Sequence, residues 1–167
     1  MITYTEVLNK GFALSKIDIL PISEKLDELS FILNEDRKKG VEVSWSTFGL
    51  DKELNDYLKK ELSKICDDYL KKLIEDIVTF EAYKTDIGEY TDLHSDSAFG
   101  GLIQVMIYYI KEDLQGRDFL YGDKSSINSI KPFSGLVVVC DQLNKEWLHG
   151  TTPLKNNCYN LCITAIR

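Results

Sequence analysis

The chain has 167 residues, enough for one domain whose hydrophobic core needs no disulfide or structural metal to hold it. Hydrophobic residues make up 44% of the chain and charged residues 28%, values typical of soluble globular domains, which argues against disordered and fibrous proteins. The net charge of −7 argues against nucleic acid as a partner, because binding to phosphate backbones draws on clustered Lys and Arg.

The chain has no apolar run near the roughly 20 residues that a membrane span requires, so we expect no membrane partner. It opens at Met1 on mixed sequence without the pattern of a signal peptide. Four cysteines lie in apolar stretches without CxxC spacing: Cys66, Cys140, Cys158 and Cys162. These features predict a cytoplasmic protein with reduced thiols that are mostly buried.

The first 77 residues favour helices. A helix is predicted over residues 23–37, with Ser23 available as the N-cap. Residues 41–48 alternate between apolar and polar side chains, as a strand does. A long helix is predicted over residues 51–77, because leucines and other apolar residues recur there at three- and four-residue spacing.

From residue 78 onward, short runs rich in Val, Ile, Tyr and Phe are separated by Gly, Asp, Asn and Ser, which predicts strands joined by turns. The predicted strands are residues 78–83, 90–94, 102–110, 118–121, 127–131, 136–140, 146–149 and 158–166. Such a series predicts a jelly roll or barrel, so the fold class is mainly β with N-terminal helices (α+β). We expect a single domain, 1–167, in which residues 1–77 are mainly helical support and residues 78–167 form the β core with the functional site.

The two histidines of the chain stand at the ends of two predicted strands. His94 belongs to the sequence His94-Ser95-Asp96, and the alternation of an extended chain lets His94 and Asp96 reach the same ion. His149 ends the later strand. Two imidazoles and one carboxylate form a facial triad, which leaves three positions open on a non-haem Fe(II) ion for a bidentate cosubstrate and O2. A His-x-Asp sequence is common by chance, so its context must support this interpretation.

Five landmarks follow one another in the second half of the chain. They are Tyr83 and Tyr90 ahead of His94-Ser95-Asp96, the run 106–113 with two tyrosines and acidic residues, the turn and strand at 115–120, the Pro132-to-Gly135 lead into a strand, and His149. In this order they resemble the Fe(II)/2-oxoglutarate dioxygenases, especially the prolyl hydroxylases, over roughly half of the chain.

This resemblance implies a double-stranded β-helix, a cupin-like jelly roll braced by helices, with His94, Asp96 and His149 as metal ligands and catalytic residues. It implies Fe(II), 2-oxoglutarate as cosubstrate and O2. The implied activity is hydroxylation of an unactivated C–H bond, on an amino acid, peptide or protein side chain or on another small molecule. Because Asp96 is present, the resemblance favours hydroxylation over halogenation, since halogenases of this family lack that carboxylate.

The last strand departs from the prolyl hydroxylase pattern. That family places an Arg or Lys nine or ten residues after the second histidine, where it pairs with the C5 carboxylate of 2-oxoglutarate. Cys158 and Tyr159 stand there in this chain. Since a buried carboxylate without a partner is costly, another residue must supply the cation.

Three cationic residues are candidates for that role: Arg117, Lys155 and Arg167. Arg117 is preferred by analogy with related asparaginyl hydroxylases and lysine demethylases, whose cosubstrate lysine lies on the corresponding strand; its alternative is a surface ion pair. Two tyrosines are candidate cosubstrate contacts by their match to the family pattern: Tyr109 and Tyr83. Tyr109 could instead be a core residue.

Weaker signals surround the motif. Asp92 could orient a ligand histidine through a hydrogen bond, or it could be a solvated acid. Cys158 and Cys162 are expected to be small core residues of the last strand. The main alternative for the whole protein is a non-catalytic member of the fold, or one with an altered cosubstrate, that acts as a binding module. A cupin-like metalloprotein of another kind would need a His-x-His sequence, which the chain lacks.

Overall fold

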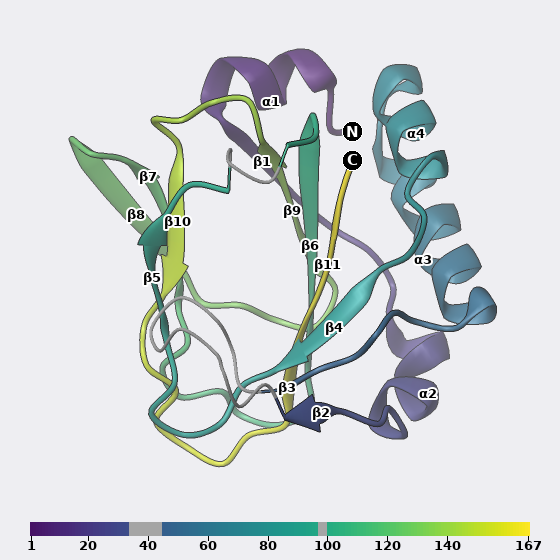
Figure 1. The fold of residues 1–167 in the computed structure, drawn as a ribbon, viewed down its shortest axis with the longest axis vertical. Coiled ribbons are helices and arrows are strands. Elements are labelled where there is room, and N and C mark those ends of the chain that lie inside the picture. The colour runs from purple at the N-terminus through teal and green to yellow at the C-terminus, as the bar shows by residue number, and fades with distance from the viewer. Residues whose placement is uncertain (34–44, 97–99) are drawn as a thin grey trace.

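The computed structural model describes residues 1–33, 45–96 and 100–167. Two antiparallel sheets face each other across the interior, and helices lie outside the larger sheet (Figure 1). This arrangement confirms the predicted fold class, a jelly roll braced by helices.

Within the described residues, the larger sheet has seven strands in the order β1-β9-β6-β11-β4-β3-β2. They are β1 (Phe12–Lys16), β9 (Leu136–Asp141), β6 (Ile103–Ile110), β11 (Asn160–Ile166), β4 (Glu81–Lys84), β3 (Trp45–Ser46) and β2 (Ile32–Leu33). Every residue of β9 is buried, and in β6 only Ile110 is not. Continuous burial of this kind follows because one face of the sheet packs against helices and the other faces the second sheet.

The smaller sheet, counted over the same described ranges, has four strands in the order β5-β10-β7-β8. They are β5 (Thr91–His94), β10 (Leu148–Thr151), β7 (Phe119–Asp123) and β8 (Ser126–Ile130). The edge strand β8 is exposed along most of its length, whereas β10 is mostly buried. All eight strands predicted from residue 78 onward are present, each with boundaries close to those predicted.

The long helix predicted over residues 51–77 is two helices, α3 (Lys52–Ile65) and α4 (Asp68–Glu75). The break follows from capping, because the side chain of Asp67 accepts hydrogen bonds from the N–H groups of Leu70 at 2.9 Å and Tyr4 at 2.8 Å. Periodicity alone could not locate the break, since the apolar stripe continues across it.

The prediction of a helix over residues 23–37 is mostly wrong. A 3-10 turn, η1 (Leu20–Ile22), leads into the short helix α2 (Ser23–Asp27), and β2 follows within the range predicted as helix. Ser23 is the first helical residue rather than the N-cap, and its hydroxyl donates to the carbonyl of Leu20 at 2.8 Å. Pairing of β2 with β3 at the sheet edge overrides the local helical preference. Residues 34–37, like 41–44 of the predicted strand, lie outside the described residues.

The N-terminal segment contains two elements that the sequence analysis did not predict, α1 (Tyr4–Lys10) and β1. Thr3 caps α1 by accepting from the N–H of Glu6, and Gly11 ends the helix at φ 80. β1 then pairs with β9 at the edge of the larger sheet, so the first half of the chain contributes strands as well as helices.

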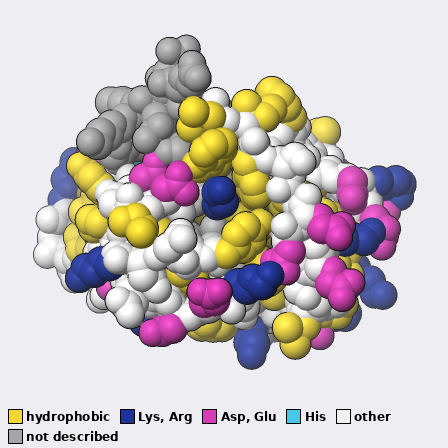
Figure 2. Space-filling view, turned by 90° about the horizontal axis from the view of Figure 1, so that it is seen from below, with side chains coloured by type: hydrophobic (Ala, Val, Ile, Leu, Met, Phe, Trp, Pro, Cys, Tyr) yellow, Lys and Arg dark blue, Asp and Glu magenta, His cyan; other side chains and the backbone are white. Residues whose placement is uncertain are grey.

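The helices present a charged outer surface. Seen from below, Lys, Arg, Asp and Glu side chains gather on the side where the helices lie, and hydrophobic side chains gather nearer the centre (Figure 2). None of the helices in the described part of the chain is long and apolar enough to cross a membrane.

Candidate metal centre

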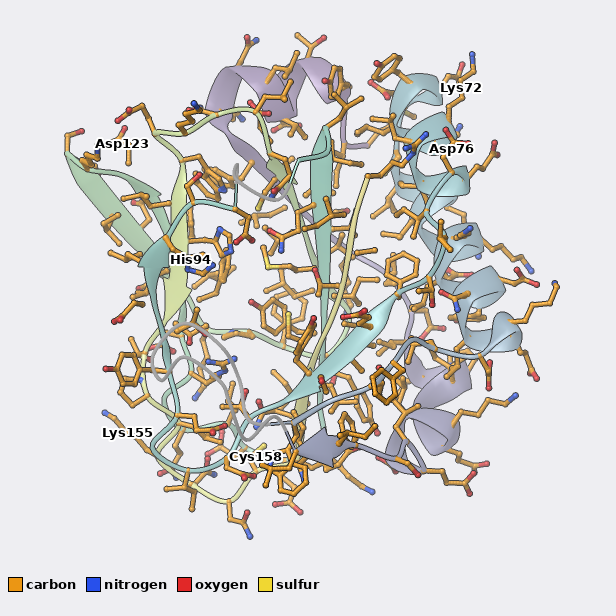
Figure 3. All side chains as sticks on the ribbon, viewed as in Figure 1. Lys72, Asp76, His94, Asp123, Lys155 and Cys158 are labelled. Atoms are coloured by element: carbon orange, nitrogen blue, oxygen red, sulfur yellow. The ribbon has the colours of Figure 1, made fainter. Side chains whose placement is uncertain are left out.

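A cavity of about 450 Å³ lies between the two sheets and contains the candidate metal ligands. The larger sheet contributes side chains of β6, β11 and β4, and the smaller sheet contributes those of β5, β10 and β7. This volume is in the range of small-molecule sites. Figure 3 shows that the His94 side chain points from β5 toward the larger sheet.

His94, Asp96 and His149 meet on the smaller sheet. His94 and His149 are directly opposite each other in the antiparallel pair β5–β10, with ring centroids 4.6 Å apart. The two Nε2 atoms lie 3.1 Å and 3.3 Å from the two oxygens of Asp96. Among the described residues these three form the one group of His, Cys, Asp and Glu able to hold a metal ion.

Gly150 allows the two histidine strands to approach. The register of β5 and β10 shifts just after His149, and a Cβ atom at Gly150 would lie 2.7 Å from the carbonyl oxygen of Thr91. No side chain can be accommodated at that distance. The glycine that follows His149 in the sequence therefore serves the backbone packing of the site.

The hydrogen bond of His94 orients its ring. Nδ1 lies 2.7 Å from the backbone carbonyl oxygen of Asp92, which can only accept, so Nδ1 carries a proton. This leaves the lone pair of the neutral ring on Nε2, facing Asp96 and His149. The carbonyl of Asp92, and not its exposed carboxylate as the sequence analysis suggested, is the group that orients the ligand.

Two of the three side chains, Asp96 and His94, have shifted pKa values. Burial alone would raise the pKa of Asp96, but hydrogen bonds with His149 and His94 hold it well below its usual range. In its protonated form His94 donates from Nε2 to Asp96, and this raises the pKa of His94 against the opposing effect of burial. Asp96 therefore remains an anion, the form in which a carboxylate binds a metal.

The geometry fits a divalent transition metal. Ligand atoms about 2.1 Å from an ion and at right angles to each other are about 3.0 Å apart. Each histidine Nε2 lies close to that distance from one oxygen of Asp96, at 3.1 Å and 3.3 Å, and one ligand atom from each of the three residues lies within 4.8 Å of the others. Two imidazoles and one carboxylate on one side of an ion suit Fe(II) and leave its other side open to the cavity.

Arg117 supplies a cation to the same cavity. It lies just before β7, is only 5% exposed, and donates from Nη1 to the hydroxyl oxygen of Thr151. Within the described ranges no carboxylate lies at ion-pair distance from it. Burial lowers the pKa of its guanidinium, but Arg remains charged in proteins. A buried cation with a neutral partner favours an anionic ligand.

The backbone of Arg117 is itself unusual. It is the one non-glycine residue with positive φ in the described part of the chain, at φ 58. A left-handed conformation costs about 1–2 kcal/mol for a residue with a Cβ. Arg117 holds it next to Gly116, and its N–H donates to the carbonyl of Pro153 at 3.2 Å.

The other two cationic candidates are not brought to the cavity. Lys155 is exposed, and Figure 3 shows it at the lower edge of the molecule, away from His94. Arg167 is exposed and pairs with Asp76, with Nη2 and Oδ2 3.0 Å apart. Their expected role at the C5 carboxylate is therefore not supported by their positions.

The expectation for Tyr109 is corrected in favour of its neighbour. Tyr109 faces the helices, packs in the core on that side, and donates its hydroxyl to Asp27 at 2.9 Å. Tyr108 is the residue that lines the cavity, because alternate residues of β6 point to opposite faces. A step of one residue along a strand exchanges the two faces, so Tyr108 and not Tyr109 is placed to contact a ligand in the cavity.

Two further cavity residues bear on the predictions. Tyr83 lines the cavity as expected, from β4. Cys162 pairs with Tyr108 across β6 and β11 and also lines the cavity, rather than being only a core residue; burial raises the pKa of its thiol to about 11. Cys158 precedes β11 and is buried in a small cluster with Leu114 and Leu154.

The residues that sequence reasoning missed are Tyr108, Cys162 and Thr151. Period two places alternate residues of β6 and β11 on one face, but only the structure shows that the face with Tyr108 and Cys162 lines the cavity. Thr151 had no comparable signal, because its contact with Arg117 joins residues 34 positions apart.

Comparison of the sequence with family models and with curated proteins finds no match. Comparison of the structure finds several similar solved structures. A prolyl-4-hydroxylase from Pseudomonas putida has a TM-score of 0.67 and 13% identity, with 98% of this chain and 95% of that chain covered. A viral collagen prolyl hydroxylase from Paramecium Bursaria Chlorella virus-1, solved with 2-oxoglutarate, has a TM-score of 0.65 and 17% identity, with 96% and 98% covered.

A prolyl hydroxylase from Trichoplax adhaerens, solved with a peptide fragment of the hypoxia inducible factor oxygen degradation domain, has a TM-score of 0.68 and 11% identity. The match covers 97% of this chain and 86% of that chain. At these identities the similarity concerns the fold. The chain has the double-stranded β-helix fold of the 2-oxoglutarate and Fe(II) oxygenases over its length.

Proposed function

We propose that this protein is an Fe(II)- and 2-oxoglutarate-dependent oxygenase that hydroxylates an unactivated C–H bond on an amino acid, peptide or protein side chain. The observation that carries the proposal is the His94–Asp96–His149 group, held at the wall of a cavity between the sheets. A facial triad in this fold is the arrangement that non-haem Fe(II) oxygenases use.

The protein's own residues would hold and orient the reactants. His94, Asp96 and His149 would bind Fe(II), with the carbonyl of Asp92 fixing the ring of His94. Fe(II) with 2-oxoglutarate supplies O2 activation, in which one oxygen atom enters the C–H bond and the other enters succinate as CO2 leaves. Met106 and Phe119 make part of the cavity wall apolar, which limits water near the reacting atoms.

Arg117 would bind the C5 carboxylate of 2-oxoglutarate. Its buried guanidinium lines the same cavity as the triad and hydrogen-bonds to the Thr151 hydroxyl, while the charge of Glu89 acts on it from beyond ion-pair distance. Tyr108 lines the cavity on the opposite sheet and can donate a second hydrogen bond. This assignment places the cation just before β7. In the prolyl hydroxylase pattern the cation lies on the last strand instead.

The substrate class is supported by a similar structure rather than by this chain's site alone. The Trichoplax adhaerens prolyl hydroxylase was solved with a peptide bound, and its chain is matched over 86% of its length. A peptide or amino acid substrate is therefore the most economical proposal for a cavity of this size and fold.

Anaerobic addition of Fe(II) and then 2-oxoglutarate tests the proposal. We expect a weak visible charge-transfer band, because 2-oxoglutarate would chelate the iron on its open side. Succinate should then form when O2 is admitted. Iron binding without the band would favour an altered cosubstrate, and no iron binding at all would overturn the proposal. His149→Ala is the matched control and should abolish the band.

A further inference from the structure

A carboxylate that the chemistry above does not use lies beside the cavity, on β4, next to the lining residue Tyr83. Tyr83 lines the cavity, and its hydroxyl donates to Oε2 of Glu81 at 2.6 Å. Since this proton is committed to Glu81, the Tyr83 oxygen offers only its lone pairs to a ligand. The Tyr83–Glu81 pair is therefore an acceptor site.

The strand register places Glu81 on the cavity side of the larger sheet. Glu81 is opposite Thr164 and Tyr83 is opposite Cys162, in the antiparallel pair of β4 with β11. Thr164 and Cys162 both line the cavity. Because residues directly opposite in a sheet point to the same face, Glu81 faces the same interior.

Glu81 lacks a counter-ion in the described part of the chain. Among residues 1–33, 45–96 and 100–167, no Lys, Arg or His side chain lies at ion-pair distance from Glu81. Glu81 is half-buried. A partly desolvated carboxylate without a cation favours a ligand that brings one.

We infer that Glu81 and Tyr83 form a subsite for the ammonium group of a cationic substrate, of the class of a lysine side chain or another alkylamine. The inference rests on the proposed function and adds the substrate class to it. An ammonium group has three donors and no acceptor, which complements one carboxylate and one hydroxyl oxygen. A substrate of the same shape without the charge leaves Glu81 unpaired, and such a mismatch discriminates strongly.

Matched ligands test this subsite. The two probes are Nα-acetyl-lysine amide and Nα-acetyl-norleucine amide, which share a straight side chain and differ at its charged end. Binding to the full chain is measured by calorimetry or ligand-observed NMR, with Zn(II) and 2-oxoglutarate present so that no turnover is needed. We expect the lysine compound to bind at least about ten-fold more tightly.

Substitution identifies the residue responsible. Glu81→Gln keeps the shape and removes the charge, so the preference for lysine should fall to about two-fold or less. Glu75→Gln, an exposed acid on α4, is the matched control and should keep the full preference. If thermal unfolding shows that Glu81→Gln is not folded, Tyr83→Phe takes its place. Tyr83→Phe removes one acceptor and should also lower the preference for lysine.

Equal binding of the two compounds would overturn the inference, as would a preference that survives in Glu81→Gln. Failure of the inference is distinguishable from failure of the proposed function. A charge-transfer band without an ammonium preference would reject the subsite alone. An ammonium preference in a protein that forms no band would reject the oxygenase activity and leave the subsite in place.

Discussion

The two sheets of the molecule carry different tasks. The larger sheet is buried on both faces at its centre, where the β6 and β9 side chains pack against helices on one side and face the smaller sheet on the other. The smaller sheet has an exposed edge strand, β8, yet it carries both histidines, and Asp96 follows its strand β5. The well-packed larger sheet therefore acts as a scaffold, while the reactive groups lie on the less buried smaller sheet.

The largest expected effect separates the two sheets by stability. Ile107→Ala in β6 should cost about 2–5 kcal/mol of the free energy of unfolding, because it leaves a cavity beneath the helices. Ile127→Ala in β8, a residue 40% exposed, should cost less than about 1 kcal/mol. Urea denaturation of both variants measures this, and similar losses would contradict the proposed division between scaffold and site.

The next effect concerns metal binding. His149→Ala should lower Fe(II) affinity by more than about 100-fold, since it removes a ligand and not merely a group that supports one. Asp92→Asn is the matched control, because only the backbone carbonyl of Asp92 contacts His94. Asp92→Asn should leave the Fe(II) affinity within about two-fold of the wild-type value. Titration under anaerobic conditions measures both, and a large loss in Asp92→Asn would restore a role for that carboxylate.

The third prediction concerns 2-oxoglutarate binding by Arg117, which lies just before β7 of the smaller sheet. Arg117→Ala and Arg117→Gly should each weaken 2-oxoglutarate binding by about 30-fold, equivalent to about 2 kcal/mol for a lost charge-assisted contact. The glycine variant should be the more stable of the two by about 1 kcal/mol, because glycine adopts φ 58 without strain.

The remaining cations are controls for that experiment. Lys155→Ala and Arg167→Ala change exposed residues outside the cavity and should leave 2-oxoglutarate affinity within about two-fold. Calorimetry of the metal-loaded protein measures each affinity. Loss of affinity in either variant, with Arg117→Ala unchanged, would move the carboxylate site to that residue.

The smallest effect concerns how α2 attaches to the larger sheet. The hydrogen bond from Lys111, and next that from Tyr109, holds the pKa of Asp27 below its usual range. A lowered pKa in the folded state means that Asp27 stabilises the protein above the usual carboxylate pKa of about 4, and that this contribution is lost as the pH falls through the lowered value. Asp27→Asn should therefore cost less than about 1 kcal/mol at neutral pH.

The pH dependence of the difference is the measurement. Thermal unfolding of the wild type and Asp27→Asn should differ at pH 7 and converge as the pH falls through the lowered pKa of Asp27, below which the carboxyl is protonated in both states. A difference that is constant across this range would mean that the charge of Asp27 contributes nothing to the attachment.

From residue 78 onward, the sequence alone was sufficient to predict the strands and the triad. Residues 78–167 contain short apolar runs bounded by turn residues, and a period of two is a local property that needs no knowledge of neighbours. The triad was predictable because the chain has only two histidines, each at a predicted strand end, so few combinations existed.

Only the tertiary structure decided the rest, because those features depend on partners distant in the sequence. The break after α3 depends on Asp67 capping α4 and binding Tyr4, 63 residues away. Whether Tyr108 or Tyr109 faces the cavity depends on the register of β6, and a shift of one residue exchanges the faces. Of the three cations proposed from the sequence, Arg117 is the one buried in the cavity beside Thr151, and this depends on the fold. Local patterns determine where strands form, whereas pairing between strands determines which side chains share the cavity.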